Sequence, residues 1–421
     1  MSLSPWLVEK EGELHADGIP LREIAARFRT PCYVYSAARI RENVERFRKT
    51  FAGLPMELHY AVKANPLGAI LCLLARDGLG AEVVSGGELL RALRAGFPSQ
   101  KIIFTGVGKT KAELELALRE GIRAVAVESM EELKALEEIS REIGCCARVA
   151  LRLNPALSPD THPHLATGRP GSKFGLDPRD AEEALAWIAR SSDLCLVGLH
   201  LHIGSQILDV EPYLAAWRYL CEILRKARDH GLSPSFLDLG GGFGISYGGE
   251  GPGFPLEELA AGLREEMPSG VTLMLEPGRA LVGDAGLLLV RVLYTKRVHE
   301  KAYVVVDAGM SDLLRPALYG AHHRIVPVRK RTGPPVKADV VGPICENADV
   351  LATDRELSPL QSGDLLAILD TGAYGSSMSS HYNSRPRGAE VLVYRGKAHL
   401  VRRRETVEDL VRGEIVPEDL G

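Results

Sequence analysis

Short β-rich runs alternate with capped helical segments between residues 55 and 280, and this alternation most constrains the fold. Two of the helices have clear ends, since Ser85 and Thr110 each stand three residues before a glutamate, and Gly96 and Gly121 follow as stop signals. Strands are expected at residues 57–62, 81–84, 101–104, 123–127, 147–153, 196–201, 235–239 and 271–275. Eight such strands, each followed by a helix, predict a closed parallel (β/α)8 barrel, with an open doubly wound sheet as the alternative.

After about residue 280 the pattern changes to strands separated by turns. The expected strands are Leu287–Tyr294, Tyr303–Val306, Leu365–Asp370 and Glu390–Tyr394. A further strand, Cys32–Tyr35, precedes the barrel, and we expect it to join this second, sandwich-like or barrel-like β domain. The 421 residues are therefore expected to divide into an N-terminal segment (1–36), a barrel (37–280) and a β domain (281–421).

Composition excludes several classes of protein. Hydrophobic residues make up 45% and the net charge is −4, which favours a large apolar core and argues against nucleic-acid binding. The basic run Arg402–Arg404 is expected to form a solvated face. No apolar run approaches the roughly 18 residues that span a bilayer, and Met1–Lys10 lacks a signal-peptide core. The seven cysteines have no CxxC spacing, which fits a reducing cytoplasm; we expect Cys145 and Cys146 to be buried.

Chemically unusual sequences follow four of the predicted barrel strands. They are Tyr60–Pro66, His200–Gln206, Gly240–Gly244 and Glu276–Arg279. In a (β/α)8 barrel the active site lies at the C-terminal ends of the strands, and ordinary connections need no such polar or glycine-rich residues. Their agreement predicts one functional site at this end of the barrel.

The first and seventh strand ends suggest groups that hold a phosphorylated aldehyde. Lys63 ends an apolar strand, where partial desolvation favours the neutral amine that forms a Schiff base. Its alternative is a lysine whose head reaches water at the barrel rim. Gly240, Gly241 and Gly242 leave backbone N–H groups bare, as a phosphate site requires, although a tight turn explains a glycine triplet equally well.

The sixth and eighth strand ends suggest contacts to a flat ring. His200 and His202 share one face of a strand, but no third ligand stands at suitable spacing, so we expect no metal. One imidazole stacked on a cofactor ring is the preferred interpretation, and a satisfied polar strand end is the alternative. Glu276 is suited to keep a pyridine nitrogen protonated, with an ion pair to Arg279 as its alternative.

The β domain has a polar cluster of its own. Arg315 and Tyr319 are four residues apart, on one face if the segment is helical. Cys345 stands beside Glu346 in a Gly-Pro loop, unlike the cysteines in apolar runs; its alternative role is a small buried hydrophobe. Tyr374 lies among small residues, as a ligand contact or a turn residue.

These segments together resemble the fold-type III pyridoxal-phosphate-dependent decarboxylases, over about residues 33–392. The motifs that carry the resemblance are Tyr60–Asn65, Val84–Leu89, Ser172–Gly175, His202–Gln206, Glu276–Arg279, Gly342–Glu346 and Tyr382–Pro386. The chain departs from the usual pattern at Glu82, where an aspartate is more common, and this affects a supporting contact near the cofactor ring.

The resemblance implies a role for each candidate residue. Lys63 would be the Schiff-base lysine, His200 would stack on the ring of pyridoxal 5'-phosphate, and Glu276 would pair with its nitrogen. Cys345 would be the proton donor, supplied by the partner subunit of a homodimer with active sites at the interface. The remaining expected contacts to cofactor or substrate are Ser205, Gly240, Gly241, Gly242, Gly278, Arg279, Arg315, Tyr319, Glu346 and Tyr374.

The resemblance is closest to members that act on meso-2,6-diaminopimelate, and it implies decarboxylation of this small amino acid to L-lysine and CO2, the last step of lysine biosynthesis. The far end of this substrate is a whole amino-acid group, which Arg279, Arg315 and Glu346 suit. Rival substrates on the same scaffold are ornithine, lysine or a carrier-bound acid. An alanine racemase would present arginine instead of Glu276, and a non-enzymatic relative is expected to have lost Lys63 or Cys345.

Overall fold

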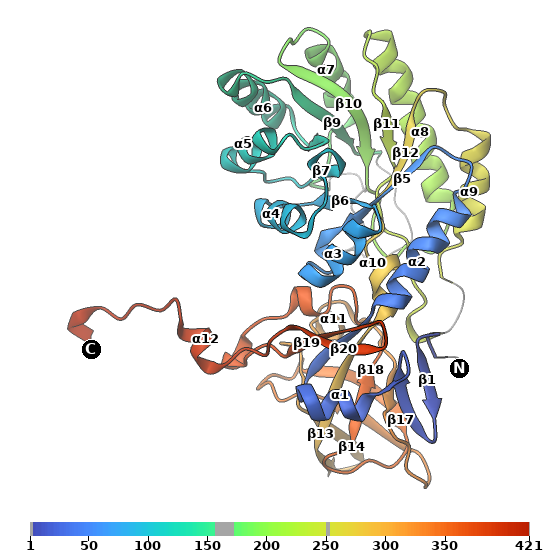
Figure 1. The fold of residues 1–421 in the computed structure, drawn as a ribbon, viewed down its shortest axis with the longest axis vertical. Coiled ribbons are helices and arrows are strands. Elements are labelled where there is room, and N and C mark those ends of the chain that lie inside the picture. Colours follow the sequence, from blue (N-terminus) through green and yellow to red (C-terminus); the bar gives the residue numbers. More distant parts are fainter. Residues whose placement is uncertain (1–2, 156–171, 250–252, 421) are drawn as a thin grey trace. The chain divides into compact units, whose positions relative to one another are not determined.

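Parallel strands form a closed barrel in the computed structural model, which describes residues 3–155, 172–249 and 253–420 (Figure 1). Ring closure is direct, because β12 pairs with β5 through Leu273–Met56 and Leu275–Leu58. The strands are β5 (Met56–Ala61), β6 (Gly80–Val83), β7 (Ile102–Phe104), β8 (Ala124–Val127), β9 (Ala147–Leu153), β10 (Leu194–Leu201), β11 (Phe236–Asp238) and β12 (Thr272–Leu275). Each predicted barrel strand is therefore confirmed within two residues, and the open sheet is excluded.

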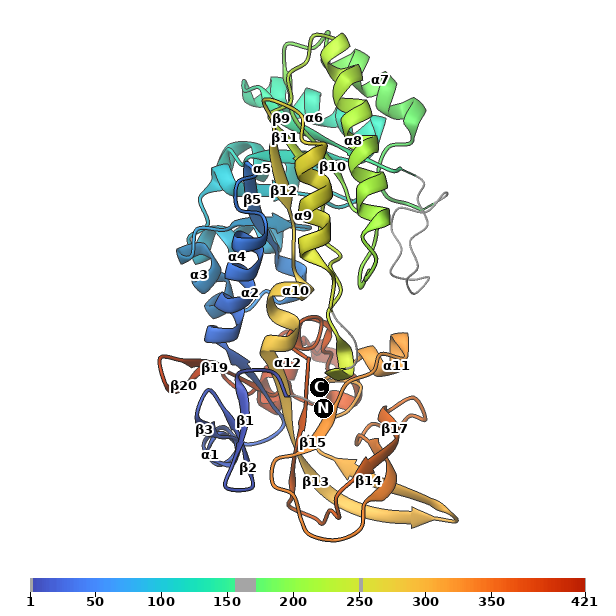
Figure 2. The ribbon, with the colours of Figure 1, turned by 90° about the vertical axis from the view of Figure 1, so that its right-hand side faces the viewer.

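A helix follows each of the strands β5 to β11, and sequence signals fix many of the helix ends. Ser85 Oγ accepts the N–H of Glu88 at 3.2 Å, Thr110 and Glu113 form a reciprocal capping box, and Gly96 ends its helix at a φ of 94°. The helices are α3 (Gly68–Arg76), α4 (Gly86–Ala95), α5 (Lys111–Glu120), α6 (Met130–Ile143), α7 (Pro178–Ile188), α8 (Glu211–Asp229) and α9 (Leu256–Glu265). Figure 2 shows α8 and α9 side by side on the outside of the barrel, where they pack together.

Small and large side chains alternate inside the barrel. Its interior is filled by Ile103, Ala124, Ala126, Ala150, Phe236 and Met274. Phe236 needs the space that Gly198 of β10 leaves, because a Cβ at Gly198 would overlap the Phe236 ring. The barrel interior is thus a packed core, and the site is confined to the C-terminal ends of the strands.

The chain divides into two compact units. The barrel unit comprises Asn43–Ser246 and Gly251–Leu281, and the β unit comprises Met1–Glu42, Tyr247–Glu250 and Val282–Gly421. Two helices lie across a boundary, α2 (Ala37–Thr50) and the single turn α10 (Arg279–Val282).

The central strand of the β unit's mixed sheet comes from the N-terminal segment. The strand β4 pairs antiparallel with β13 and parallel with β19, so the expectation that Cys32–Tyr35 joins the β domain is confirmed. The strands are β4 (Cys32–Ser36), β13 (Gly286–Val298), β14 (Lys301–Val306), β15 (Ile325–Pro327), β16 (Val336–Val341), β17 (Val350–Leu357), β18 (Leu365–Ile368), β19 (Ala389–Tyr394) and β20 (Lys397–Arg402). The unit also contains the small sheet β1 (Leu7–Lys10), β2 (Glu13–Ala16) and β3 (Ile19–Pro20), and helices α1 (Leu21–Phe28), α11 (Arg315–Tyr319) and α12 (Val407–Val411).

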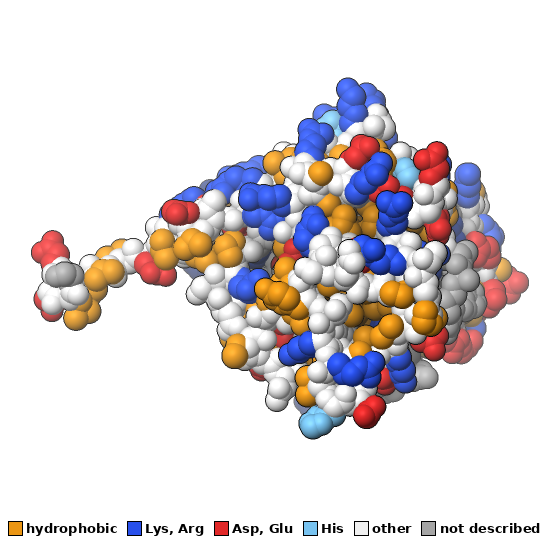
Figure 3. All heavy atoms as spheres, turned by 90° about the horizontal axis from the view of Figure 1, so that it is seen from below, with side chains coloured by type: hydrophobic (Ala, Val, Ile, Leu, Met, Phe, Trp, Pro, Cys, Tyr) orange, Lys and Arg blue, Asp and Glu red, His pale blue; other side chains and the backbone are white. Residues whose placement is uncertain are grey.

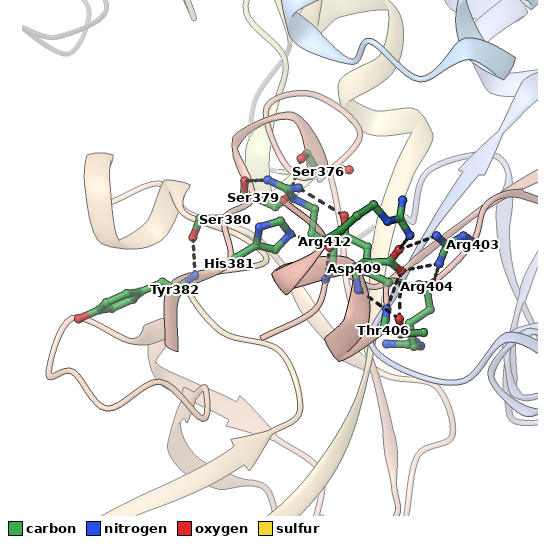
Figure 4. Close-up of polar contacts among 12 residues, drawn as sticks. Ser376, Ser379, Ser380, His381, Tyr382, Arg403, Arg404, Thr406, Asp409 and Arg412 are labelled. Atoms are coloured by element: carbon green, nitrogen blue, oxygen red, sulfur yellow. Dashed lines mark hydrogen bonds and ion pairs between the residues drawn. The ribbon is translucent and has the colours of Figure 1, made fainter. Parts of the chain in front are cut away.

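The basic run 402–404 is only in part the solvated face that its composition suggested, since Arg403 is exposed and Arg402 and Arg404 are half-buried. Arg402 pairs with the buried Glu390 at 2.8 Å, and Arg404 donates to the carbonyl of Pro31 at 2.8 Å. Arg403 binds Asp409 at 2.6 Å and so anchors α12, whose N-cap is Thr406 (Figure 4). Charge composition misled for Arg402 and Arg404, because their acceptors become neighbours only in the folded unit.

The adjacent cysteines 145 and 146 and the segment after α12 are two further features of the surface. Cys146 is exposed and Cys145 half-buried, so the prediction that both are buried is wrong; they lie in the turn after α6 and not inside a strand. Beyond α12 the chain extends away from the rest of the β unit (Figure 1), and its side chains form a projecting tail (Figure 3) in which Ile415 is 92% exposed. Among the described residues no helix is long and apolar enough to cross a membrane.

Candidate active site

A cavity of about 510 Å³ opens at the C-terminal ends of the barrel strands. Its wall includes Lys63, Glu82, Arg152, His200 and Glu276, which come from five different strand ends. The strand ends that the sequence singled out by their polar residues therefore meet at one place. Parallel strands make this possible because all their carboxyl ends lie at the same rim.

Lys63 lies in the turn directly after β5 and reaches Glu82 at the end of β6. Its Nζ is 2.6 Å and 2.8 Å from the two carboxylate oxygens of Glu82, whose side chain is almost fully buried. The Thr105 hydroxyl also donates to Glu82. A buried carboxylate thus holds the lysine head at the cavity and is itself fixed by the next strand, which argues against a lysine that merely reaches water at the rim.

His200, Asp238 and Glu276 form a buried polar cluster at the ends of β10, β11 and β12. His200 Nε2 lies 3.3 Å from Glu276 Oε2, and one ligand atom of each of the three residues lies within 4.8 Å of the others. Burial raises the pKa of Glu276, but His200 and Lys63 outweigh it and lower this pKa to about 2. Burial and the neighbouring Glu276 raise the pKa of Asp238 well above its usual range. The cluster therefore presents an ionised Glu276 to the cavity.

These three residues are close enough to share a metal ion by distance alone. Asp238 Oδ1, however, accepts the N–H of Gly240 at 2.9 Å, and His200 Nε2 faces Glu276. An arrangement in which two of the three groups already bind protein atoms favours an organic ring over a cation, and the absence of a metal stays a prediction.

The close packing around the loop after β11 requires its glycine triplet, whether or not the loop binds a ligand. A Cβ at Gly241 or Gly242 would overlap the backbone carbonyl of Glu276 or of Gly204, respectively. The N–H groups of Gly240 and Gly241 donate to Asp238 at 2.9 Å and to His202 Nδ1 at 3.2 Å. Two amides of the triplet are thus engaged within the protein, and phosphate binding by the triplet stays a prediction.

Ser205 and Arg279 meet beside this loop. Arg279 Nη2 donates to Ser205 Oγ at 2.8 Å, and Arg279 is only 5% exposed. A Cβ at Gly278 would press against Ala61 and Ala64, on either side of the Lys63 turn. The motif Glu276–Arg279, which follows β12, therefore packs directly on the segment that carries Lys63. A common binding site for both segments would require this contact.

Glu128, at the end of β8, was not singled out by the sequence. It binds Arg152 at 2.6 Å and accepts the N–H groups of Gly106 at 2.8 Å and Gly175 at 3.2 Å. The Arg152 guanidinium also lies 4.8 Å from the centre of the Phe174 ring, over its face. One buried carboxylate thereby connects three walls of the cavity, and the only sequence signal for it was its position after a strand.

In the β unit, Arg315 and Tyr319 begin and end α11, so their predicted helical spacing is confirmed. Arg315 is 3% exposed; it donates to the Tyr247 hydroxyl at 2.9 Å and lies 3.0 Å from His323 Nε2. His323 Nδ1 faces the carbonyl of Leu369 at 2.9 Å and must donate to it, which leaves Nε2 as the acceptor for Arg315. Tyr247 and His323 were missed, because neither belongs to a recognisable motif.

Cys345 and Glu346 are exposed, which excludes the alternative of a buried cysteine. The N–H of Cys345 donates to Asn383 Oδ1 at 3.0 Å, and a hydrogen bond to Glu346 raises the pKa of the Tyr382 hydroxyl. Two motifs that are distant in sequence, Gly342–Glu346 and Tyr382–Pro386, therefore lie side by side. Tyr374 is half-buried with a left-handed φ of 55°, which suits either a turn or a ligand contact.

The cavity fits pyridoxal phosphate on its own geometry. Glu276 Oε1 is buried and has no hydrogen-bond partner among the described residues, so it can accept a pyridine N–H. The flat imidazole of His200 stands beside it, and the amine of Lys63 lines the same cavity. The cavity thus has a carboxylate that can pair with the ring nitrogen, an imidazole that can stack on the ring, and an amine that can bind the aldehyde.

Comparisons with known proteins agree with this chemistry. The family model "Pyridoxal-dependent decarboxylase, pyridoxal binding domain" matches residues 37–283. Diaminopimelate decarboxylase of Aquifex aeolicus is 44% identical over 97% of both chains, and that of Pseudomonas aeruginosa 45% identical over 96% of this chain and 97% of the relative.

Solved structures are similar over the same extent. Diaminopimelate decarboxylase from M. jannaschii has a TM-score of 0.94 at 38% identity, covering 99% of both chains. The enzyme from Helicobacter pylori, complexed with L-lysine, has a TM-score of 0.90 at 40% identity, covering 93% of this chain and 98% of that one. The chain therefore belongs to the diaminopimelate decarboxylase family of pyridoxal-dependent decarboxylases.

Proposed function

We propose that this protein decarboxylates meso-2,6-diaminopimelate to L-lysine and CO2, the last step of lysine biosynthesis, with pyridoxal 5'-phosphate as cofactor. The observation that carries the proposal is the cavity in which Lys63, His200 and Glu276 meet at the carboxyl ends of the barrel strands. The near-full-length similarity to diaminopimelate decarboxylases supports the choice of substrate.

The barrel unit would hold the cofactor. Lys63 would bind its aldehyde, His200 would cover one face of its ring, and Glu276 would accept the ring N–H. The phosphate would be bound near Ser205, Gly240, Gly241, Gly242, Gly278 and Arg279, with Tyr374 contributed by the β unit. Arg279 supports this assignment because its buried guanidinium donates to Ser205 at 2.8 Å, which joins two of these expected phosphate contacts.

When bound, the protonated pyridine ring supplies a sink for the electrons that the departing carboxylate leaves behind. The ionised Glu276 keeps the ring nitrogen protonated, which is the condition for this sink. Lys63 would bind the aldehyde through its amine, which Glu82 at 2.6 Å holds at the cavity.

Substrate selection would lie with residues of both units. Arg279 and Arg315 would bind the distal carboxylate, Glu346 the distal ammonium, and Tyr319 and Tyr374 would line the pocket. Cys345 would return a proton to the carbon after CO2 leaves, and its exposure in the β unit supports a role at a shared surface.

We further propose a homodimer with active sites at the interface and a cytoplasmic location, which the free thiols suit. In this scheme residues 37–280 bind the cofactor, and residues 281–421, joined by 1–36, supply substrate and dimer contacts.

The proposal is tested by incubating the cofactor-loaded protein separately with meso-diaminopimelate, ornithine and lysine, and identifying the products by mass. L-lysine and CO2 are expected from diaminopimelate alone, and Lys63→Ala is the control that should form neither. Faster release of putrescine or cadaverine from the other two substrates would contradict the proposed specificity.

A further inference from the structure

Asp238 has no place in the chemistry described so far, although it lies within the buried cluster beneath the cavity. It ends β11, is 0% exposed, and its neighbours include Glu276 and the glycine loop. One of its oxygens, Oδ1, accepts the N–H of Gly240 at 2.9 Å. Its Oδ2 and Glu276 Oε1 are both buried acceptors without a donor among the described residues.

Two buried carboxyl groups side by side cannot both be ionised at an acceptable energy. A single proton between them removes the repulsion and gives both orphaned oxygens a hydrogen bond. We propose that Asp238 is a positioning residue that carries this proton and donates it to Glu276, so that Glu276 stays ionised and aimed at the ring nitrogen. This inference rests on the proposed cofactor site.

The proton belongs on Asp238 because the neighbours of Glu276 favour a charged carboxylate and those of Asp238 do not. Glu276 interacts with His200 and Lys63, which favour its charged form, whereas the charges that act on Asp238 are those of Glu276 and Glu82. The pKa of Asp238 is raised by its burial and by Glu276, in the direction that the geometry requires. A carboxylate has about four acceptor sites, so Glu276 can accept from Asp238 and from a ring N–H together.

The experiment compares two amide substitutions that have the same shape as the acids. In Asp238→Asn the amide can accept from Gly240 and donate to Glu276, as a protonated aspartate does. We expect the affinity for pyridoxal phosphate, measured by equilibrium dialysis, to stay within about threefold of wild type. The matched variant Glu276→Gln removes the charge itself, and we expect the affinity to fall by about 10- to 100-fold.

Two further measurements separate this role from simple packing. Asp238→Ala removes the donor and should lose cofactor affinity, and circular dichroism will show whether it folds. In the cofactor-free protein, the infrared difference spectrum between wild type and Asp238→Asn should show the loss of one band of a protonated carboxylic acid, because the bands of other protonated acids such as Glu88 cancel. Neither measurement depends on turnover, so the inference can fail while the proposed reaction stands.

Two results would overturn the proposal. One is a loss of cofactor affinity in Asp238→Asn as large as in Glu276→Gln, which would show that Asp238 acts as an anion, for example as a cation ligand. The other is an unchanged carboxylic-acid band in Asp238→Asn, which would place the proton elsewhere.

Discussion

At the level of single residues, the pair Lys63–Glu82 decides how the site is prepared for its cofactor. Glu82 accepts from Lys63 and from Thr105, so the amine is held in position before any ligand arrives. The longer glutamate, where the family more often has aspartate, still reaches Lys63 at 2.6 Å. The departure noted in the sequence is therefore accommodated within the cavity.

This arrangement predicts where the cofactor attaches. Borohydride reduction of the yellow holoenzyme should fix the cofactor to Lys63, because this amine alone of the lysines lines the cavity in the described part of the chain. Peptide mapping by mass spectrometry checks the site, with Lys63→Ala as the unlabelled control. A label on any other lysine removes Lys63 from the proposed role.

A second residue-level prediction concerns Glu88, in the first turn of α4. Burial, followed by the charge of Glu82, raises its pKa to about 7 in the folded protein. Its unfolded value is about 4.3, so its contribution to stability is complete below that pH and is lost as the pH rises through 7. Wild type should therefore lose stability over this range, and Glu88→Gln should not.

The difference in free energy of unfolding between Glu88→Gln and wild type should grow by on the order of 1–3 kcal/mol from pH 4.5 to pH 8. Urea denaturation at several pH values measures it, and Glu120→Gln, a change at an exposed glutamate, is the control. Parallel pH profiles for Glu88→Gln and wild type would contradict the prediction.

At the level of elements, the barrel strands are fitted to one another by residue size. Gly198 of β10 lies against Phe236 of β11, whose ring fills the barrel interior. Gly198→Ala should therefore overpack the core and lower the free energy of unfolding by about 1–3 kcal/mol.

The matched control is Gly68→Ala at the start of α3, where a new Cβ would meet nothing within 4 Å. This change should alter stability by less than about 0.5 kcal/mol. Thermal unfolding followed by circular dichroism distinguishes the two, and equal effects would show that the strand packing is looser than the structure indicates.

At the level of the whole molecule, the candidate residues are divided between two units. Lys63, His200 and Glu276 belong to the barrel unit, and Arg315, Cys345 and Glu346 to the β unit. A two-fold dimer, the commonest protein symmetry, would allow the β unit of one chain to complete the barrel site of the other.

Mixing Lys63→Ala and Cys345→Ala proteins tests this sharing. Each homodimer should be severely impaired, whereas a mixed dimer would carry both substitutions in one site and none in the other. Random exchange makes half of the dimers mixed, so activity should recover to about a quarter of wild type. If native mass spectrometry confirms exchange and activity does not recover, each site is built from one chain.

The sequence by itself determined the local features of this protein. Strand and helix positions followed from apolar periodicity, and capping residues such as Thr110 and Gly121 act on N–H and C=O groups a few residues away. The positions of Lys63 and Glu276 at strand ends were likewise predictable, because a closed parallel barrel places all such ends at one rim.

Only the tertiary structure decided which distant residues became partners. Glu128 binds Gly106 and Gly175, Asp238 lies beside Glu276, and Tyr247 meets Arg315 in the β unit. No local pattern marks such pairs, since they arise when barrel closure or sheet pairing brings together side chains that are far apart along the chain. The half-buried arginines at 402 and 404 were misjudged for the same reason: their acceptors, Glu390 and Pro31, become neighbours only through the pairing of β19 with β20 and with β4.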